Sequence, residues 1–198
     1  MQYIVKRTNV VDWADIPKAE INSYVWGKEY TPEAYAQLAM INGKGFVLKM
    51  TAFEKEPLTR YSKYGDPVYT DSCLEFFVSF NNKSPLYMNF EMNSAGAFLS
   101  AIRTDRKNKT PIDQVVTELP VVTSEHKDGC WTVEVEFSFA FIEQLFGKCT
   151  FGNGYTFKGN FYKCGDETEI PHFGSWSPIE LEKPDFHRPE FFGTLTIM

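Results

Sequence analysis

The sequence predicts an all-β protein: an antiparallel β-sandwich (immunoglobulin-like or jelly-roll-like) of about ten strands with little helix. Short apolar runs recur along the chain and are separated by Asn, Gly, Ser and Pro, which is typical of strands and turns. Several runs alternate apolar and polar residues with a period of two. The 198 residues include 18 Phe, 10 Tyr and 4 Trp, enough apolar area for one core. We therefore expect a single domain over residues 1–198.

The N-terminal part contains one ambiguous segment. A first strand is predicted over residues 3–7, followed by an irregular segment over 12–26 that docks its tryptophans and isoleucines on the core. Residues 32–40 have high helix propensity, and Pro32 suits a helix start. However, Asn42-Gly43 follows, with a second apolar run beyond it. Because Asn-Gly between two apolar runs is the strongest local hairpin signal, we predict two strands here.

The remaining elements follow the same logic. A hairpin is predicted over residues 67–91, with its turn at 81–85, where Asn, Ser and Pro gather. Trp131, Val133, Val135 and Phe137 alternate with polar residues, which predicts a half-buried strand. A short helical segment over 139–146 ends at Gly147. The other predicted strands cover 97–102, 115–123, 155–164, 173–177 and 192–197, and residues 103–114 are predicted to form a charged loop.

Polar residues inside the central hairpin are the most informative feature of the sequence. Glu75, Asn89 and Glu91 lie in aromatic-rich strands, where strand propensity disfavours them. Together with Tyr69 they could line one open face of a sheet. An aromatic ring beside hydrogen-bonding groups suits a sugar, which has an apolar C–H face and many hydroxyls. The alternative is that these carboxylates are ordinary solvent-facing positions of an antiparallel sheet.

A second candidate aromatic ring lies near the end of the chain. Phe186 is bracketed by Pro184 and Pro189, which stiffen the backbone around it. A rigid loop makes a good ligand platform because little order must be gained on binding. The alternative is that Phe186 seals one end of the sandwich.

Composition and charge exclude several classes of function. The net charge of −6 leaves no basic footprint for nucleic acid, and no apolar run reaches the ~18 residues of a membrane helix. The N-terminus does not read as a signal peptide, so we expect a cytoplasmic protein, or a secreted one whose leader is missing from this chain. The four cysteines form no CxxC pair, which argues against zinc, and we expect free thiols.

No motif for catalysis is evident. The sequence has no Gly-rich phosphate loop, no GxSxG and no HExxH, and its three histidines are scattered. The paired carboxylates of the hairpin keep a glycoside hydrolase open, because neighbouring strands could hold two carboxyl groups at either of the spacings that such enzymes use.

Three groups of residues carry a resemblance to a known family. They are Tyr69-Thr70-Asp71-Ser72 leading to Glu75; Gly159-Asn160-Phe161 with Asp166 downstream; and Ser175-Trp176-Ser177 followed by Phe186, Pro189 and Phe192-Gly193-Thr194-Leu195. With these residues in this order, the chain resembles the family 9 carbohydrate-binding modules, β-sandwich modules found in or near xylan-degrading enzymes.

The resemblance implies a non-catalytic module that binds a terminal sugar between two aromatic rings. Tyr69 and Phe186 match the positions of the two tryptophan platforms in sugar-binding members, so both platforms are smaller here. Glu75 matches the glutamate that binds hydroxyls, and Asn160 matches a strand asparagine near the site. Trp176 matches a tryptophan that we expect to be structural. The implied partners are oligosaccharides or polysaccharides of xylan or glucan type.

The resemblance leaves two points open. Some members hold a structural calcium, but no Asp-rich loop in this chain demands one, so no metal or other cofactor is assigned. The predicted sugar-binding residues are Tyr69, Phe186, Glu75, Asn89, Glu91 and Asn160. The rival functions are an endo-xylanase-like glycoside hydrolase and a scaffold domain that has lost sugar binding.

Overall fold

The computed structural model describes residues 1–198, which form fourteen strands, one α-helix and four short 3-10 turns. The strands are β1 (Gln2–Thr8), β2 (Ala19–Glu20), β3 (Ser23–Trp26), β4 (Ala34–Ile41), β5 (Gly45–Ala52), β6 (Cys73–Ser79), β7 (Tyr87–Asn93), β8 (Phe98–Arg103), β9 (Lys109–Pro111), β10 (Val122–Lys127), β11 (Cys130–Ser138), β12 (Thr156–Gly165), β13 (His172–Ser175) and β14 (Gly193–Ile197). The helix α1 spans Phe139–Phe146, and the 3-10 turns are η1 (Trp13–Asp15), η2 (Val68–Thr70), η3 (Ile112–Gln114) and η4 (Pro189–Phe191).

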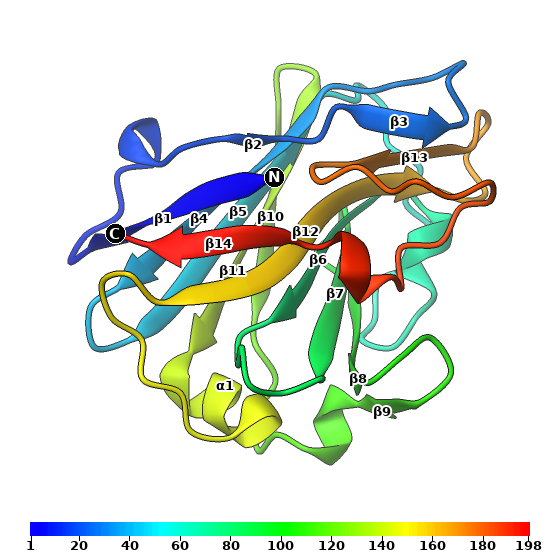
Figure 1. Cartoon of the computed structure of the whole chain (residues 1–198). Helices are drawn as coiled ribbons and strands as arrows, with labels where there is room; N and C mark the ends of the chain where they lie inside the picture. The colour runs from blue at the N-terminus through cyan, green and yellow to red at the C-terminus, as the bar shows by residue number, and fades with distance from the viewer.

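The strands form one sheet that curls into two facing layers. Its order is β10-β11-β5-β4-β1-β14-β12-β6-β7-β8-β9, with β2, β3 and β13 at its margins. In Figure 1, β4, β5, β10 and β11 lie behind β12 and β14, and β1 and β14 form the bend between the layers. The predicted all-β architecture is confirmed.

The sheet is mixed, so the prediction of a purely antiparallel sandwich is wrong. β1 pairs in parallel with both β14 and β4, whereas the other pairs are antiparallel. Two strands that pair in parallel cannot be joined by a tight turn, so a long stretch of chain must lie between them. This holds for both pairs: residues 9–33 separate β1 from β4, and β1 and β14 are the first and last strands of the chain.

Several predicted boundaries are also wrong. There are fourteen strands instead of about ten, and the extra ones, β2, β3 and β9, fall in segments predicted to be irregular or loops. These strands have only two to four residues, too few to show a period of two. The strand predicted over 115–123 lies at 122–127 as β10, whose residues are mostly exposed and polar. Pairing with β11 selects this register, and the local apolar content does not.

The ambiguous segment and the helix follow the predictions. β4 and β5 form the hairpin predicted around Asn42-Gly43, with Gly43 at a φ of +72°. α1 begins at Phe139 and is capped by Ser138, whose Oγ accepts a hydrogen bond of 3.1 Å from the amide of Phe141. It ends at Phe146, just before Gly147, whose φ of +73° suits glycine best. With eight residues, α1 is too short to span a membrane.

Aromatic rings join the two layers. Phe137 of β11 contacts the rings of Phe90 and Phe76 in the opposite layer, with centroids 5.1 and 6.3 Å apart. Phe76 in turn stacks on Phe161 of β12 at 4.9 Å. Trp176 is 4 % exposed and packs edge-on against Phe161, which confirms that it belongs to the core.

A buried ion pair also links the layers. The amino group of Lys163 on β12 lies 3.2 Å from a carboxylate oxygen of Glu54, which follows β5, and Lys163 is completely buried. The same oxygen accepts a hydrogen bond of 3.0 Å from the indole of Trp131 on β11. Because the Glu54 carboxylate has both a cation and a hydrogen-bond donor as partners, this ion pair can be buried in the core.

β6, β7 and β12 are buried on both faces. Their alternate residues point either into the core between the layers or to the opposite face, beneath the loop that joins β13 to β14. Successive side chains of a strand point to opposite faces, so Phe76 points into the core and Glu75 points to the opposite face. The second face carries the polar residues predicted from the sequence.

Candidate functional site

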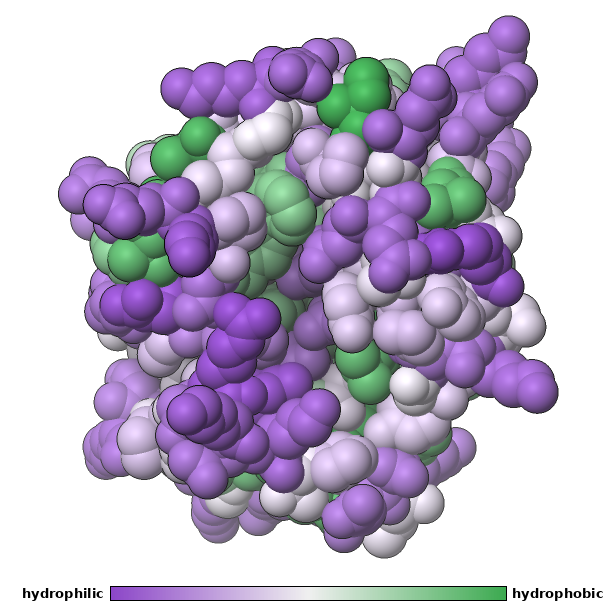
Figure 2. Space-filling model, turned by 90° about the vertical axis from the view of Figure 1, so that its right-hand side faces the viewer, coloured by the Kyte–Doolittle hydropathy of each residue, from purple (hydrophilic) through white to green (hydrophobic).

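A cavity of about 610 Å³ lies over the outer face of β6, β7, β8 and β12, within the ~300–1,000 Å³ range of small-molecule sites. Figure 2 faces this side of the molecule and shows hydrophilic side chains around a hollow with hydrophobic surface set into it. The residues that line the cavity are Tyr69, Glu75, Phe77, Glu91, Leu99, Arg103, Arg106, Lys109, Cys164, Asp166, Phe173, Lys183, Pro184, Asp185, Phe186 and His187.

The structure brings four of the six predicted residues to this cavity: Tyr69, Glu75, Glu91 and Phe186. Glu75 and Glu91 are directly opposed on β6 and β7, so both side chains are on the same face of the sheet. Tyr69 lies in η2, just before β6, and its side chain is 39 % exposed. An aromatic ring at that exposure is available to a ligand.

The loop that carries Phe186 is held firmly on the sheet. The ring of Phe186 stacks on Tyr162 of β12, with centroids 4.1 Å apart and planes 9° apart. The Tyr162 hydroxyl donates a hydrogen bond of 3.3 Å to the carbonyl of Phe186. Next to it, His187 pairs with the hydroxyl of Tyr87 at 3.1 Å and lies against Phe77. Phe186 is therefore half-buried and held in place by these contacts.

A buried aspartate holds the segment that carries Tyr69. Asp71 is completely buried and accepts hydrogen bonds from the amides of Arg60 and Tyr61 at 2.9 and 3.1 Å. It also accepts from the guanidinium of Arg60 at 3.0 Å and from the side-chain amide of Asn93 at 3.0 Å. These contacts tie the segment of Arg60 and Tyr61 and the end of β7 to the residue that follows η2. Asp71 thus holds the chain next to Tyr69 and does not line the cavity.

The two glutamates form a buried acidic floor. Glu75 accepts a hydrogen bond of 3.0 Å from the thiol of Cys164, while Glu91 accepts one of 2.8 Å from the side chain of Asn89. Burial, assisted by the charge of nearby groups, raises the pKa of Glu75 well above its ordinary value. Burial likewise raises the pKa of Glu91 to about 7, although Asn89 and Arg103 oppose the shift. Around neutral pH the floor can therefore donate as well as accept hydrogen bonds.

Asn89 supports the floor from beneath and does not line the cavity. Its side-chain oxygen accepts a hydrogen bond of 2.6 Å from Nε of Arg103, and its amide donates to Glu91. A chain of hydrogen bonds thus runs from Arg103 through Asn89 to Glu91. The other oxygen of Glu91, Oε2, is buried and has no partner. A buried acceptor without a partner is costly when it is ionised, which agrees with the raised pKa of Glu91.

Asn160 also lies away from the cavity. It is completely buried, and its amide donates 2.8 Å to the carbonyl of Ser177 while its oxygen accepts 2.8 Å from the amide of Ser177. This double contact ties β12 to the start of the loop that carries Phe186. The predicted pairing of Asn160 with a ligand is therefore not supported by its position, and its contacts indicate a structural role.

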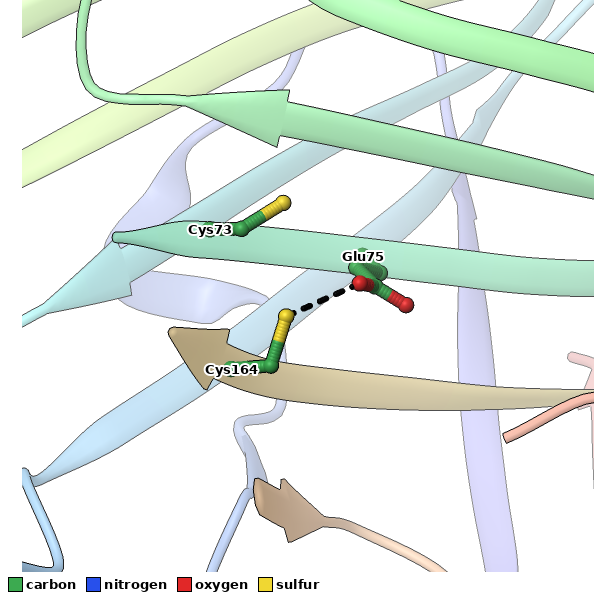
Figure 3. A group of neighbouring side chains, drawn as sticks. All are labelled: Cys73, Glu75 and Cys164. Atoms are coloured by element: carbon green, nitrogen blue, oxygen red, sulfur yellow. Dashed lines mark hydrogen bonds between the residues drawn. The ribbon is translucent and has the colours of Figure 1, made fainter. Parts of the chain in front are cut away.

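Two cysteines adjoin the floor (Figure 3). Cys73 on β6 and Cys164 on β12 are directly opposed, and the thiol of Cys164 points toward Glu75. The two sulfur atoms and a carboxylate oxygen of Glu75 lie within 4.8 Å of one another, a donor set that would suit a thiophilic cation. Burial raises the pKa of the Cys73 thiol to about 12, so the pair is protonated at neutral pH. All four cysteines are free, as expected.

The sequence analysis missed the cations of the cavity. Arg103, Arg106, Lys109 and Lys183 all line it. Arg103 is the last residue of β8, where it lies diagonally opposite Asn89, and the predicted strand stopped one residue short of it. A local sequence pattern could have extended that strand by one residue to include Arg103. It could not have shown that Lys183, far away in the sequence, lines the same cavity.

Another cavity, of about 520 Å³, lies between α1, β11 and the segment 117–121. Its lining contains carboxylates, small polar groups and the mostly buried ring of Phe141, and it contains no cation. The first cavity combines accessible aromatic rings with buried groups whose hydrogen-bonding capacity is not exhausted. It is therefore the better candidate for a binding site.

The chain is similar to known carbohydrate-binding proteins in both sequence and fold. The model of carbohydrate-binding family 9 matches residues 6–197. A Bacteroides uniformis crystal structure, named as that of a "putative carbohydrate-binding protein", superposes with a TM-score of 0.83 at 27 % identity and covers 100 % of this chain and 99 % of that one. No protein of curated function matches the sequence significantly.

Two further solved structures share the fold at lower identity. Both are of a family 9 carbohydrate-binding module from Caldicellulosiruptor kristjanssonii, one in complex with cellotriose and one with glucose. Each has a TM-score of 0.65 and 11 % identity, and each alignment covers 100 % of this chain. The alignments cover 93 % of the chain in the cellotriose complex and 96 % in the glucose complex.

Proposed function

This chain belongs to carbohydrate-binding family 9, and we propose that its cavity binds the terminal sugar of an oligosaccharide without cutting it. One observation carries the proposal. Tyr69, Glu75, Glu91 and Phe186, which are far apart in the sequence, line a single cavity. Two aromatic rings offer surfaces for the C–H faces of a pyranose, and two carboxyl groups offer partners for its hydroxyls. That combination is what a neutral sugar requires.

The proposal also ranks the sugars that the cavity would bind. The cellotriose and glucose bound by the two Caldicellulosiruptor modules make cello-oligosaccharides the first ligands to test. Xylo-oligosaccharides come second. A cavity of about 610 Å³ has room for one or two sugar rings, which favours recognition of a chain end over recognition of a long internal segment.

The test is calorimetric titration of Tyr69→Ala and Phe186→Ala with cellotriose and xylotriose. Stacking of a base on an aromatic ring is worth ~1–3 kcal/mol, and a similar scale for a sugar predicts that each variant binds about ten-fold more weakly. Phe53→Ala is the matched control, since Phe53 is 43 % exposed and lies outside the cavity. Thermal denaturation checks that each variant is folded.

Two results would contradict this assignment. If Tyr69→Ala and Phe186→Ala stay folded and bind like the parent protein, these rings are not the platform. The loop with Tyr61 and Tyr64 would then be the next place to look. If the parent protein binds no glycan at all, the scaffold reading, in which the fold is retained and sugar binding is lost, is correct.

The glycoside hydrolase reading keeps one observation in its favour, the directly opposed carboxyl groups of Glu75 and Glu91. Such an enzyme needs one carboxyl protonated and the other ionised at its working pH. Burial raises the pKa of both groups here, which favours the protonated form of each. Release of reducing sugar from cellulose or xylan by the pure protein, abolished by Glu75→Gln, would establish catalysis.

A further inference from the structure

One wall of the cavity carries positive charge that the protein itself does not neutralise. Arg103 ends β8, Arg106 follows it, Lys109 begins β9, and Lys183 extends from the loop opposite. Of these, only Arg106 forms an ion pair, with Asp185 at 3.1 Å. Lys109 and Lys183 are exposed and pair with no carboxylate.

Arg103 is the decisive residue because it is only 6 % exposed. Its Nε donates to the side-chain oxygen of Asn89 at 2.6 Å, and its Nη1 donates to the carbonyl of Arg106 at 2.8 Å. Both acceptors are neutral, and Arg103 forms no salt bridge. The second terminal nitrogen, Nη2, donates to no protein atom and is not sealed from the cavity. A buried guanidinium without an anionic partner is costly.

The carboxyl groups of the floor cancel this charge only in part. Burial raises the pKa of Glu75 and of Glu91, which favours their neutral forms. The same positive charges act on His187 in the neighbouring loop. The pKa of His187 is lowered to about 3, first by burial and then by the charges of Arg103, Arg106 and Lys109. Two more carboxyl groups line the cavity: Asp185, which pairs with Arg106, and Asp166, whose pKa burial raises to about 6. The unpaired positive charge is therefore concentrated on the wall where Arg103 and Lys109 face each other across β8 and β9, although the whole chain has a net charge of −6.

We infer that the preferred ligand of the cavity is an acidic sugar, whose carboxylate lies against Arg103 and Lys109 while its ring packs on the aromatic side chains. This inference rests on the proposed function and names the class of sugar. A carboxylate at Nη2 of Arg103 would neutralise the buried guanidinium through a charge-assisted hydrogen bond. A neutral hydroxyl could accept the same hydrogen bond, but it would leave the charge uncompensated. Uronic acids, hexoses oxidised at C6, provide a ring and a carboxylate of this kind in one residue.

The experiment compares sugars that share the ring and differ in the group attached at C5: a carboxylate, its neutral methyl ester or a hydroxymethyl group. D-glucuronic and D-galacturonic acids, their methyl esters, and D-glucose and D-galactose are titrated into isotopically labelled protein at neutral pH, with amide chemical shifts as the readout. Each acid should bind about ten-fold more tightly than its ester. The preference should shrink as salt is raised, since partly exposed charges are screened.

Variants assign the preference to residues. Arg103→Gln should remove most of the acid-to-ester preference, and Lys109→Gln should reduce it by about three-fold, the scale of one exposed charge. Lys44→Gln, an exposed lysine in the turn between β4 and β5, is the matched control and should leave the ratio unchanged. Amide spectra and melting temperatures confirm that the variants are folded.

The outcomes separate this inference from the proposed function. If esters and neutral sugars bind as tightly as the acids, the protein binds sugars and the acid preference is wrong. If the acids bind preferentially but folded Arg103→Gln keeps that preference, the anion lies elsewhere and the inference is also wrong. If neither acids, esters nor neutral sugars bind, the proposed function itself fails.

Discussion

The two faces of β6, β7 and β12 are similarly buried but are built on different principles. On the inner face, Phe76, Phe90 and Phe161 contact other aromatic rings, and their packing is complete without any ligand. On the outer face, Glu75 and Glu91 are 3 and 4 % exposed and are held by hydrogen bonds. The hydrogen-bonded chain there ends in an unpartnered oxygen of Glu91. Burial alone therefore does not separate structural from functional positions. Incomplete polar satisfaction does so only at residues that line the cavity, because Thr51 Oγ1 on β5 is also buried without a partner and lies outside it.

The largest effect should come from the inner face. Phe76→Ala removes a completely buried ring that stacks on Phe161 and contacts Phe137, so we expect a loss of ~3–5 kcal/mol in the free energy of unfolding. Glu75→Gln, the adjacent residue on the other face, is the control. Its amide keeps an acceptor for the Cys164 thiol, so stability should change by less than ~1 kcal/mol. Urea unfolding measures both. Equal losses in the two variants would refute the distinction between the faces.

A pH-dependent effect should come from Glu91. Its pKa is about 7 in the folded protein against an ordinary value of 4.5, so folding favours the protonated carboxyl. The stabilisation is complete below about pH 4.5 and is lost as pH rises toward 7. Glu91→Gln cannot ionise, so at pH 8 it should be more stable than the parent by up to about 3 kcal/mol. The difference should vanish near pH 4.

Urea unfolding at several pH values measures this difference. Glu136→Gln, an exposed carboxyl on β11, is the control and should show no such trend. A constant difference between Glu91→Gln and the parent across the whole range would contradict the pKa shift at Glu91.

The inner face could largely be predicted from the sequence, and the reason is local. The alternation that begins at Trp131, the Asn-Gly turn and the helix stop at Gly147 each depend on a few neighbouring residues. The parallel pairing of β1 with β4 and β14 depends on contacts between distant segments, which no local pattern encodes. The buried pair of Lys163 and Glu54 was missed for the same reason, because each residue is acceptable in the core only beside the other.

The cavity could be predicted only in part. Glu75 and Glu91 stand out because they are carboxylates inside apolar strands, and Phe186 stands out because two prolines bracket it. Asn89 and Asn160 give the same local signal, yet their hydrogen-bonding groups are used by Arg103, Glu91 and Ser177. A sequence shows that a polar group is present in a strand, but it does not show whether another part of the chain satisfies it.

The smallest effect should come from Asn160, which sharpens the comparison within the outer face. Both functional groups of its side chain contact the backbone of Ser177, at the base of the loop that carries Phe186. Asn160→Ala leaves that buried amide and carbonyl without partners, which should cost ~1–3 kcal/mol in the free energy of unfolding. Affinity for the oligosaccharide should fall by no more than about three-fold, because Asn160 touches no part of the cavity and acts only through the loop. Calorimetric unfolding and sugar titration of the same preparation give both numbers. An unchanged melting temperature with abolished sugar binding would show instead that Asn160 contacts the ligand, and that incomplete polar satisfaction does not identify the binding residues of this face.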